Sequence, residues 1–195
     1  MTATAIDATQ TRVAGKGHVL IAPKGSTVPA DTTTAWDAAW QDLGFCDEKG
    51  VTLSKKDTKT AIKGWQAITP VRYILTDRDV HAMWVMEQWN KVTLALWSGE
   101  GPSAVGPNAA VSGEYKLTLS PSPSADERML GIEWTDAEMV VTHRMYMGRG
   151  LITDTADLPI TRTGLVTLGV TYQTMAIDAS TPIATLLMKD PSMAP

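Results

Sequence analysis

The side chains that most often do chemistry in proteins are few in this sequence and widely spaced. The three histidines are His18, His81 and His143, and none stands in an HExxH or comparable arrangement of metal ligands. Each is therefore interpreted as a structural or surface histidine. The segment GKG at 15–17 lacks the further glycine, and the Ser or Thr, of a phosphate-binding loop. We expect no metal site and no cofactor.

The single cysteine and the acidic pairs could supply a nucleophile or a general acid and base. Cys46 precedes Asp47 and Glu48, whose charges disfavour its thiolate form. The pairs Asp47/Glu48 and Asp126/Glu127 stand in turn-like contexts, and they could act in catalysis only if folding brought them into a cleft. No GxSxG segment is present. The sequence therefore supports no enzyme, and one cysteine cannot form an intrachain disulfide.

Composition and charge narrow the class of protein. The chain has 195 residues, of which 44% are hydrophobic and 19% charged, as is usual for a folded globular protein. The formal net charge of −4 disfavours a protein that grips nucleic acid by neutralising its phosphates. The first residues lack the basic and apolar regions of a signal peptide, and no apolar run reaches the ~18 residues of a membrane-spanning helix. We therefore expect a soluble protein made in the cytoplasm, with no membrane partner.

Hydrophobic periodicity indicates the elements that carry these residues. Residues 1–16 are small and polar and are predicted to form an N-terminal arm, with 17–195 as a single β domain. A long β-hairpin is predicted over about 50–76, with a polar turn around 55–63 that has nothing apolar to bury. Further strands are predicted at 18–23, 92–97, 115–119, 129–136, 139–147 and 166–173.

The most unusual stretch is DRDVHAMWVMEQWN, at 77–90, which is rich in tryptophan and methionine. Its apolar residues follow helical spacing, so a helix is predicted here, with Thr76 or Asp77 as its N-cap. One apolar stripe comprises Ala82, Val85, Met86 and Trp89, and a second comprises Val80, Met83 and Trp84. A helix lying on a sheet buries one stripe, so the other needs a covering loop or a neighbouring subunit.

The strand patterns also predict the class of fold. Strands with one apolar and one polar face, as at 166–173, belong to antiparallel sheets. The sequence shows no alternation of strands and helices of the βαβ kind. The predicted fold is therefore mainly β: an antiparallel β-sandwich or barrel with one flanking α-helix and extended loops.

The order of these segments resembles that of a known family. A polar arm leads into GHVLIAPKG, then WxxLG at 40–44, a long hairpin containing WQ, and a segment ending in WSG at 97–99. The strand LPITRTGLVTLGVTYQ closes the series. This order resembles the major tail proteins, or tail tube proteins, of phages with long non-contractile tails, particularly phages of actinobacterial hosts.

The resemblance implies a structural protein of the virion tail. In the family, a β-sandwich or barrel with a flanking helix forms hexameric rings whose sheets join into an inner β-barrel. Rings stack into the tube that conducts DNA during ejection, and the hairpin and the N-terminal arm contact neighbouring subunits and rings. The implied partners are further copies of the chain, the tape measure protein in the lumen, and tail terminator and distal tail proteins at the ends. DNA would pass without specific binding, and a net charge of −4 fits an acidic lumen along which DNA slides.

The predicted subunit interface combines the hairpin with one helix stripe. Its candidate residues are Lys55, Lys56, Asp57, Lys59, Trp65, Ala82, Val85, Met86 and Trp89. Two alternatives stay open at this point. One is a monomeric β-sandwich that binds carbohydrate or protein through an aromatic platform. The other is a related tube protein of a contractile or secretion apparatus.

Overall fold

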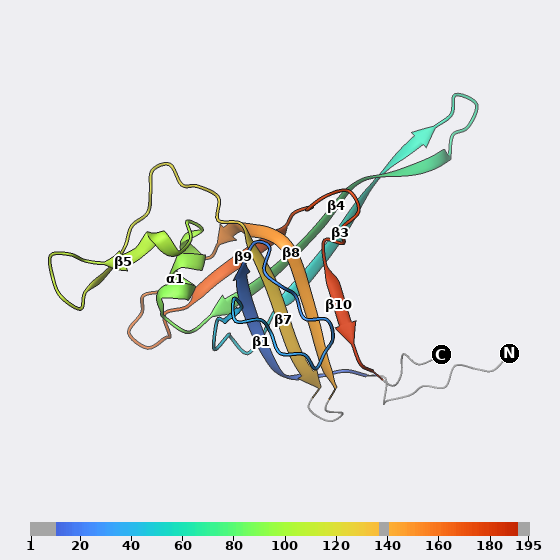
Figure 1. Ribbon diagram of the computed structural model, residues 1–195. Helices are drawn as coiled ribbons and strands as arrows, with labels where there is room; N and C mark the ends of the chain where they lie inside the picture. The colour runs from blue at the N-terminus through green and yellow to red at the C-terminus, as the bar shows by residue number, and fades with distance from the viewer. Residues whose placement is uncertain (1–10, 137–140, 191–195) are drawn as a thin grey trace. The chain divides into compact units, whose positions relative to one another are not determined.

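The computed structural model describes residues 11–136 and 141–190, and its contacts divide the chain into two compact units. The first unit comprises Met1–Phe45, Glu127–Arg149 and Ala176–Pro195, and the second comprises Cys46–Asp126 and Gly150–Met175. Both are built on antiparallel strands, and α1 (Lys91–Ser98) is the single α-helix of the described residues (Figure 1). The predicted mainly-β, antiparallel class with one α-helix is confirmed. The single domain over 17–195 stays a prediction.

In the first unit, the sheet is arranged around β1 (Ala14–Pro23). This strand pairs with β7 (Arg128–Asp136) on one edge and with the short β2 (Gln41–Asp42) on the other, both antiparallel. β8 (Thr142–Thr155) follows β7, and β10 (Thr185–Met188) pairs with its first part. The sequence of neighbours is therefore β2-β1-β7-β8, with β10 paired to β8.

The core of the first unit explains why HVLIAP forms a strand. Residues 19–22 are all buried, so both faces of this part of β1 are covered. The indoles of Trp36 and Trp40 lie together with ring centroids 4.6 Å apart. A Cβ on Gly131 would come within 2.7 Å of Trp36 and 2.9 Å of Trp40, so glycine at this position makes room for both rings. The core cluster comprises Leu20, Ala22, Trp40 and Met129, with Val28, Trp36 and Tyr146 packed against it.

In the second unit, β4 (Pro70–Met86) is the central strand. It pairs with β3 (Thr52–Lys63) over most of its length and, from His81 to Met86, with β9 (Leu168–Thr174). β9 pairs in turn with residues 150–155 of β8, giving the order β8-β9-β4-β3. The rest of the unit comprises α1, the 3₁₀ turn Pro102–Ala104, and a small ribbon of β5 (Val105–Pro107) and β6 (Tyr115–Leu117).

The predicted hairpin is present, with different bounds. It was predicted over about 50–76, but β4 continues to Met86. Its turn lies between Lys63 and Pro70, and not around 55–63 as predicted. Residues 55–63, expected to form the turn, belong to the extended strand β3.

One irregularity in this hairpin changes which residues share a face. Thr58 lies opposite Asp77, whereas Lys59 lies opposite Leu75, so Thr76 is an extra residue, a β-bulge, in β4. The hydroxyl of Thr76 donates to the carbonyl oxygen of Thr58 over 3.2 Å. Because side chains alternate along a strand, the bulge shifts the alternation of β4 by one residue relative to β3.

The predicted helix at 77–90 is wrong, because most of this stretch completes β4. Neither Thr76 nor Asp77 caps a helix. Every second residue is buried, on what we call the core face of β4: Val80, Ala82, Trp84 and Met86. His81, Met83 and Val85, between them, lie on the opposite face and are more exposed. Because both faces of this part of β4 carry apolar residues, its sequence also fits helical spacing. The stretch is a strand because it pairs with β9.

The predicted strand at 92–97 is also wrong, because Lys91–Ser98 is α1. Asn90 begins the helix: its Oδ1 accepts from the amide of Val92 over 2.8 Å and from that of Thr93 over 3.1 Å. The amide of Asn90 donates to the hydroxyl of Thr93 over 3.0 Å, which completes a reciprocal capping box. Gly99, with φ of 69°, ends the helix in the left-handed conformation that glycine accepts without strain.

The other strand predictions are confirmed within the described residues. The segments at 18–23, 115–119, 129–136 and 166–173 contain β1, β6, β7 and β9 in turn. The segment predicted at 139–147 contains the start of β8 from Thr142; residues 139–140 lie outside the described residues. Of the predicted arm, 1–10 lie outside the described residues and 14–16 belong to β1.

Candidate functional site

The hairpin of the second unit is the segment that the family resemblance associates with assembly. β9 lies beside β4 only from His81 to Met86. Beyond His81, no third strand joins β3 and β4 among the described residues, so residues 55–80 form a two-stranded ribbon (Figure 1). A ribbon of two strands has both faces and both outer edges uncovered and is marginally stable by itself in water.

Ionic contacts between the strands hold the half of the ribbon nearest the sheet. Asp57 lies directly opposite Arg78, and its Oδ1 accepts from Arg78 Nε over 2.8 Å. Lys55 Nζ donates to the other carboxylate oxygen of Asp57 over 2.6 Å. Hydrogen bonds from Arg78 and then Lys55 lower the pKa of Asp57 to about 2. The carboxylate is therefore ionised at neutral pH and ties β3 to β4.

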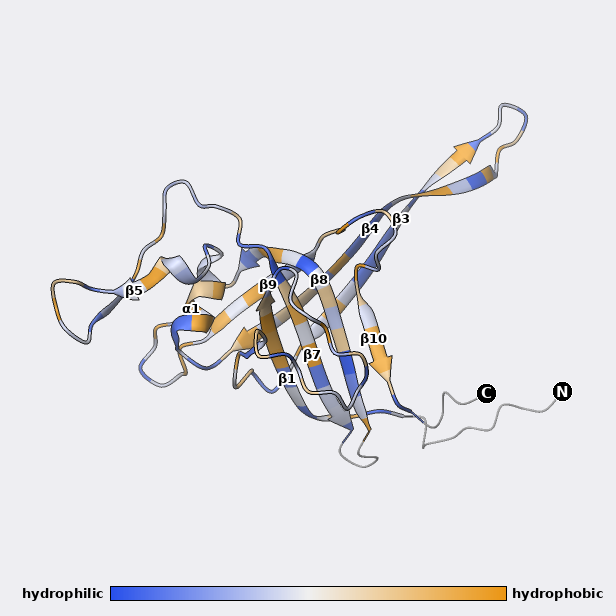
Figure 2. Cartoon of the chain, viewed as in Figure 1, coloured by the Kyte–Doolittle hydropathy of each residue, from blue (hydrophilic) through white to orange (hydrophobic). Residues whose placement is uncertain are grey.

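The end of the ribbon is apolar, which contradicts the predicted polar turn. Trp65 is 98% exposed and Ile68 is 97% exposed, and both lie in the turn between the strands. Further exposed apolar side chains on the two strands are Ile62, Val71, Tyr73, Ile74 and Leu75. Figure 2 shows hydrophobic residues on both strands of the hairpin toward its turn. A concentration of exposed apolar side chains is typical of a surface that another molecule covers.

The nine predicted interface residues divide into accessible and inaccessible groups. The exposed ones are Lys55, Lys56, Lys59, Trp65 and Trp89, and the half-buried ones are Asp57 and Val85. Ala82 and Met86 have no exposed surface, because they lie on the core face of β4. These two residues are core residues of the second unit and are withdrawn from the interface. The helix stripe that grouped them with Trp89 does not exist.

Sequence reasoning missed most of the exposed apolar residues of the ribbon. The sequence predicts a hairpin whose turn has nothing apolar to bury, and Trp65 is the member of this exposed set that the predicted interface included. In a two-stranded ribbon neither face is covered by the chain, so residues of both faces are exposed.

A second feature fixes the N-terminal segment to the first unit. Arg12 donates from Nε and Nη2 to the two carboxylate oxygens of Asp190, each over 2.6 Å. The Asp190 side chain is only 2% exposed. The amide of Val13 donates to Asp136 Oδ2 over 3.1 Å, just before β1 begins. The start of β1 is therefore tied to the β7 and β10 ends of its own unit.

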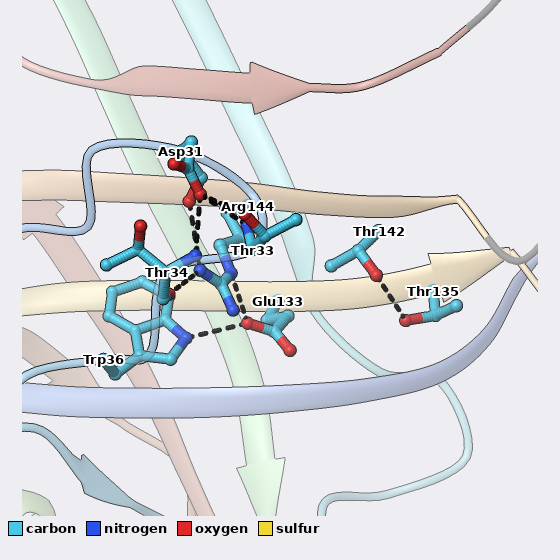
Figure 3. Close-up of polar contacts among 8 residues, drawn as sticks. All are labelled: Asp31, Thr33, Thr34, Trp36, Glu133, Thr135, Thr142 and Arg144. Carbon is cyan, nitrogen blue, oxygen red and sulfur yellow. Dashed lines mark hydrogen bonds and ion pairs between the residues drawn. The ribbon is translucent and has the colours of Figure 1, made fainter.

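A third polar cluster lies under the loop between β1 and β2 (Figure 3). Arg144, on β8, is buried, and its Nε donates to Glu133 Oε2 on β7 over 2.6 Å. Trp36 Nε1 donates to the same oxygen over 2.8 Å. Arg144 Nη1 donates to the carbonyl oxygens of Asp31, over 3.0 Å, and of Thr34. The guanidinium also lies 5.5 Å from the centre of the Trp36 ring.

The loop around Asp31 is itself held by local hydrogen bonds. The Asp31 carboxylate accepts from the amides of Thr33 and Thr34 and from the Thr33 hydroxyl (Figure 3). These bonds, led by that from the Thr34 amide, hold the pKa of Asp31 well below its usual range. Arg144 Nε donates to a carboxylate and Nη1 donates to two carbonyls, so this cluster positions the loop.

The residues first considered for chemistry are spread over the chain. His18 Nδ1 lies 2.7 Å from Asp42 Oδ2 in an exposed pair, and buried His143 stacks on Trp134. Within residues 11–136 and 141–190, no group of three or more His, Cys, Asp or Glu is arranged to hold a metal ion. Arg149, followed by Lys24, lowers the pKa of Glu127 to about 2, so this carboxyl is a poor proton donor.

The hairpin, with its uncovered apolar end, is therefore the candidate site. In the described part of the chain, no helix is long and apolar enough to cross a membrane. A family model described as phage tail tube protein matches residues 4–195.

The chain belongs to the phage tail tube protein family. This is a family of structural tail proteins and not of enzymes, so the tail tube protein is a component of the virion. A comparison with curated proteins found no match. A tail tube protein forms a tube with further copies of itself.

Proposed function

We propose that this tail tube protein forms hexameric rings that stack into the tube of a long non-contractile phage tail. The tube is the conduit for DNA during ejection. The family match supports a tube-forming role, and the exposed apolar end of the hairpin is the structural observation that carries the proposal.

The hairpin provides a physical reason for association. Trp65 and Ile68 keep almost all of their side-chain surface in water in the single chain. Burying apolar surface contributes about 25 cal/mol per Å², and association between copies is the way in which this chain can gain that contribution. The interface we propose retains Lys55, Lys56, Asp57, Lys59, Trp65, Val85 and Trp89 of the predicted set.

Other partners follow from the same proposal. The tape measure protein occupies the lumen, and tail terminator and distal tail proteins close the two ends of the tube. DNA passes without specific binding, which the net charge of −4 supports because like charge disfavours adhesion to phosphate. The subunits are made in the host cytoplasm before they join the virion.

Electron microscopy of the purified protein tests this function. We expect rings with six-fold symmetry and tubes built from them, and Trp65→Ser should reduce their yield because it removes the most exposed indole. Trp65→Phe is the matched control, since it keeps an aromatic ring at this position and should assemble. A species that stays at 21.0 kDa under all conditions would contradict the proposal and favour a monomeric binding module.

A further inference from the structure

The ribbon at 55–80 is attached to the sheet of the second unit along a short boundary. The last backbone pair between β4 and β9 joins His81 to Gln173, and β9 ends one residue later, at Thr174. Beyond His81, β4 pairs only with β3. A two-stranded ribbon varies more in its twist than a wider sheet. Backbone pairing alone therefore fixes the direction of the ribbon relative to β9 only weakly.

Two side chains of β9 continue the attachment past this last pair. The hydroxyl of Thr174 donates to the carbonyl oxygen of Val80 over 2.7 Å, and this contact is buried. Gln173 Nε2 donates to Asp79 Oδ1 over 2.5 Å and to the same Val80 oxygen over 3.3 Å. The side chains of β9 therefore hold two residues of β4 that lie beyond its backbone pairing with β9.

The two side chains act from opposite faces of the strands. Thr174 is buried and lies on the same face as Val80, the core face of β4. Gln173 and Asp79 are half-buried and lie on the opposite face, because side chains alternate along each strand. A tilt of the ribbon toward either face would lengthen one of these contacts, so together they oppose movement in both directions.

The ionic contacts farther along the ribbon have a different effect. Asp57 accepts from Arg78 and from Lys55, and all three residues belong to β3 or β4. These bonds join the two strands of the ribbon to each other, and none of them reaches β9. They stiffen the ribbon itself, whereas its direction relative to the sheet depends on Gln173 and Thr174.

We propose that Gln173 and Thr174 are positioning residues that hold the ribbon in one direction in the free subunit, before any other copy binds. An arm that is already held in its binding-competent direction loses less conformational freedom on association, which increases affinity. This proposal rests on the self-assembly proposed above, because the gain in affinity is realised only when the ribbon contacts other copies. The direction of the ribbon is nevertheless a property of the single chain and can be measured without assembly.

Distances between two spin labels measure this direction in the free subunit. Lys59→Cys places one label on the ribbon, and Lys91→Cys places the other at the start of α1, which belongs to the same unit. Cys46→Ser removes the native thiol. We expect double electron–electron resonance, at a protein concentration too low for assembly, to give one narrow distribution of distances.

Gln173→Met combined with Thr174→Val removes both donors and keeps side chains of similar size. This double variant should broaden the distribution of distances in the labelled free subunit. In the unlabelled chain, it should raise the protein concentration needed for tube formation about tenfold, as expected if the binding-competent direction is populated about a tenth of the time. Thr171→Val is the matched control, because it removes a hydroxyl of β9 where β9 is paired with β4. It should leave both measurements unchanged.

Urea unfolding of the free subunits separates positioning from a general loss of structure. A merely structural role would lower the urea midpoint without broadening the distribution of distances. Gln173→Met alone is the second variant, and it retains the buried contact of Thr174 with Val80. Because Gln173 is only half-buried, this variant provides the test if the double variant does not fold.

Three results would overturn the proposal. A broad distribution in the parent protein would show that the ribbon has no preset direction. A distribution that stays narrow in the variants would show that Gln173 and Thr174 do not set it. A broadened distribution with unchanged tube formation would show that the direction in the free subunit does not matter for assembly. If the parent forms no tubes, the proposed self-assembly fails instead, and the label distances still decide whether these two residues position the ribbon.

Discussion

The Arg144 guanidinium donates to the Glu133 carboxylate over 2.6 Å, and the loop between β1 and β2 closes over this pair through the carbonyls of Asp31 and Thr34. The pair joins two strands and one loop of the first unit. Since Arg144 is buried, its charge is tolerated only because every neighbour in this cluster is an acceptor or an aromatic face.

Arg144→Met should destabilise the protein by about 3 kcal/mol, since removal of one partner leaves a half-buried carboxylate without its cation. This value is at the low end of the range because the Glu133 side chain is 22% exposed. Urea unfolding of the free subunit measures the change. Lys24→Met is the control: Lys24 pairs with Glu127 at the surface, so its loss should destabilise the protein far less than Arg144→Met. Equal costs for the two variants would contradict this account of the loop.

Asn90→Ala should destabilise the protein by about 1 kcal/mol, because it removes the side chain that accepts from the first amides of α1. Asn90→Asp retains an acceptor at the same position and should be close to neutral. Denaturant unfolding of both variants checks the prediction. If alanine and aspartate at 90 behave alike, the cap does not determine where the helix begins.

Arg78→Met should raise the pKa of Asp57 from about 2 toward its ordinary value of 3.8, because Arg78 is the largest cause of the shift. Lys55→Met should raise it less. Since the pKa is lower in the folded state, the contribution of Asp57 to stability is present above pH ~4 and is lost as the pH falls toward 2. An NMR titration of the carboxyl carbon gives the pKa values directly. A larger shift in Lys55→Met than in Arg78→Met would reverse the assigned order of the two partners.

Removal of residues 1–10 should prevent tube formation and leave the stability of the free subunit within about 0.5 kcal/mol of the parent. The truncation retains Arg12, whose pair with Asp190 anchors the segment before β1. Arg12→Ala in the full chain should lower the free energy of unfolding by about 3 kcal/mol. The reason is that the Asp190 carboxylate, which is almost inaccessible to water, loses its cation. Normal tubes from the truncated protein would show that the N-terminal arm is not a contact between rings.

The strands of the first unit could be predicted because their signals are local. HVLIAP and MLGIEWTD have apolar side chains at the spacing that a sheet requires, and the structure forms strands at both. The stretch from 77 to 98 could not be resolved in this way. Val80, Ala82, Trp84 and Met86 alternate, yet Met83 and Val85 between them are also apolar, so the helical period fits too. The choice depends on β9, whose residues stand far away in the sequence.

Asn90 and Thr93, which form the capping box, are a local signal for a helix that begins after Asn90, where α1 lies. The alternation of residues in VTLALW favours a strand instead, and the prediction followed this alternation. The exposed residues of the ribbon had no local signal, because their exposure depends on where β9 begins and ends. If β9 extended beside Tyr73 and Leu75, the same residues would form an ordinary buried strand.

The bulge at Thr76 has a consequence for how subunit and assembly are joined. By shifting the alternation of β4 by one residue, it aligns Tyr73 and Leu75 with Val80, Ala82 and the rest of the core face. Tyr73 and Leu75 therefore share a face with the core residues of the second unit, and the Asp57–Arg78 ion pair lies between Leu75 and Val80 on that face. A neighbouring copy that covers Tyr73 and Leu75 would build a second apolar layer beyond this ion pair, on the same face as the core of the subunit.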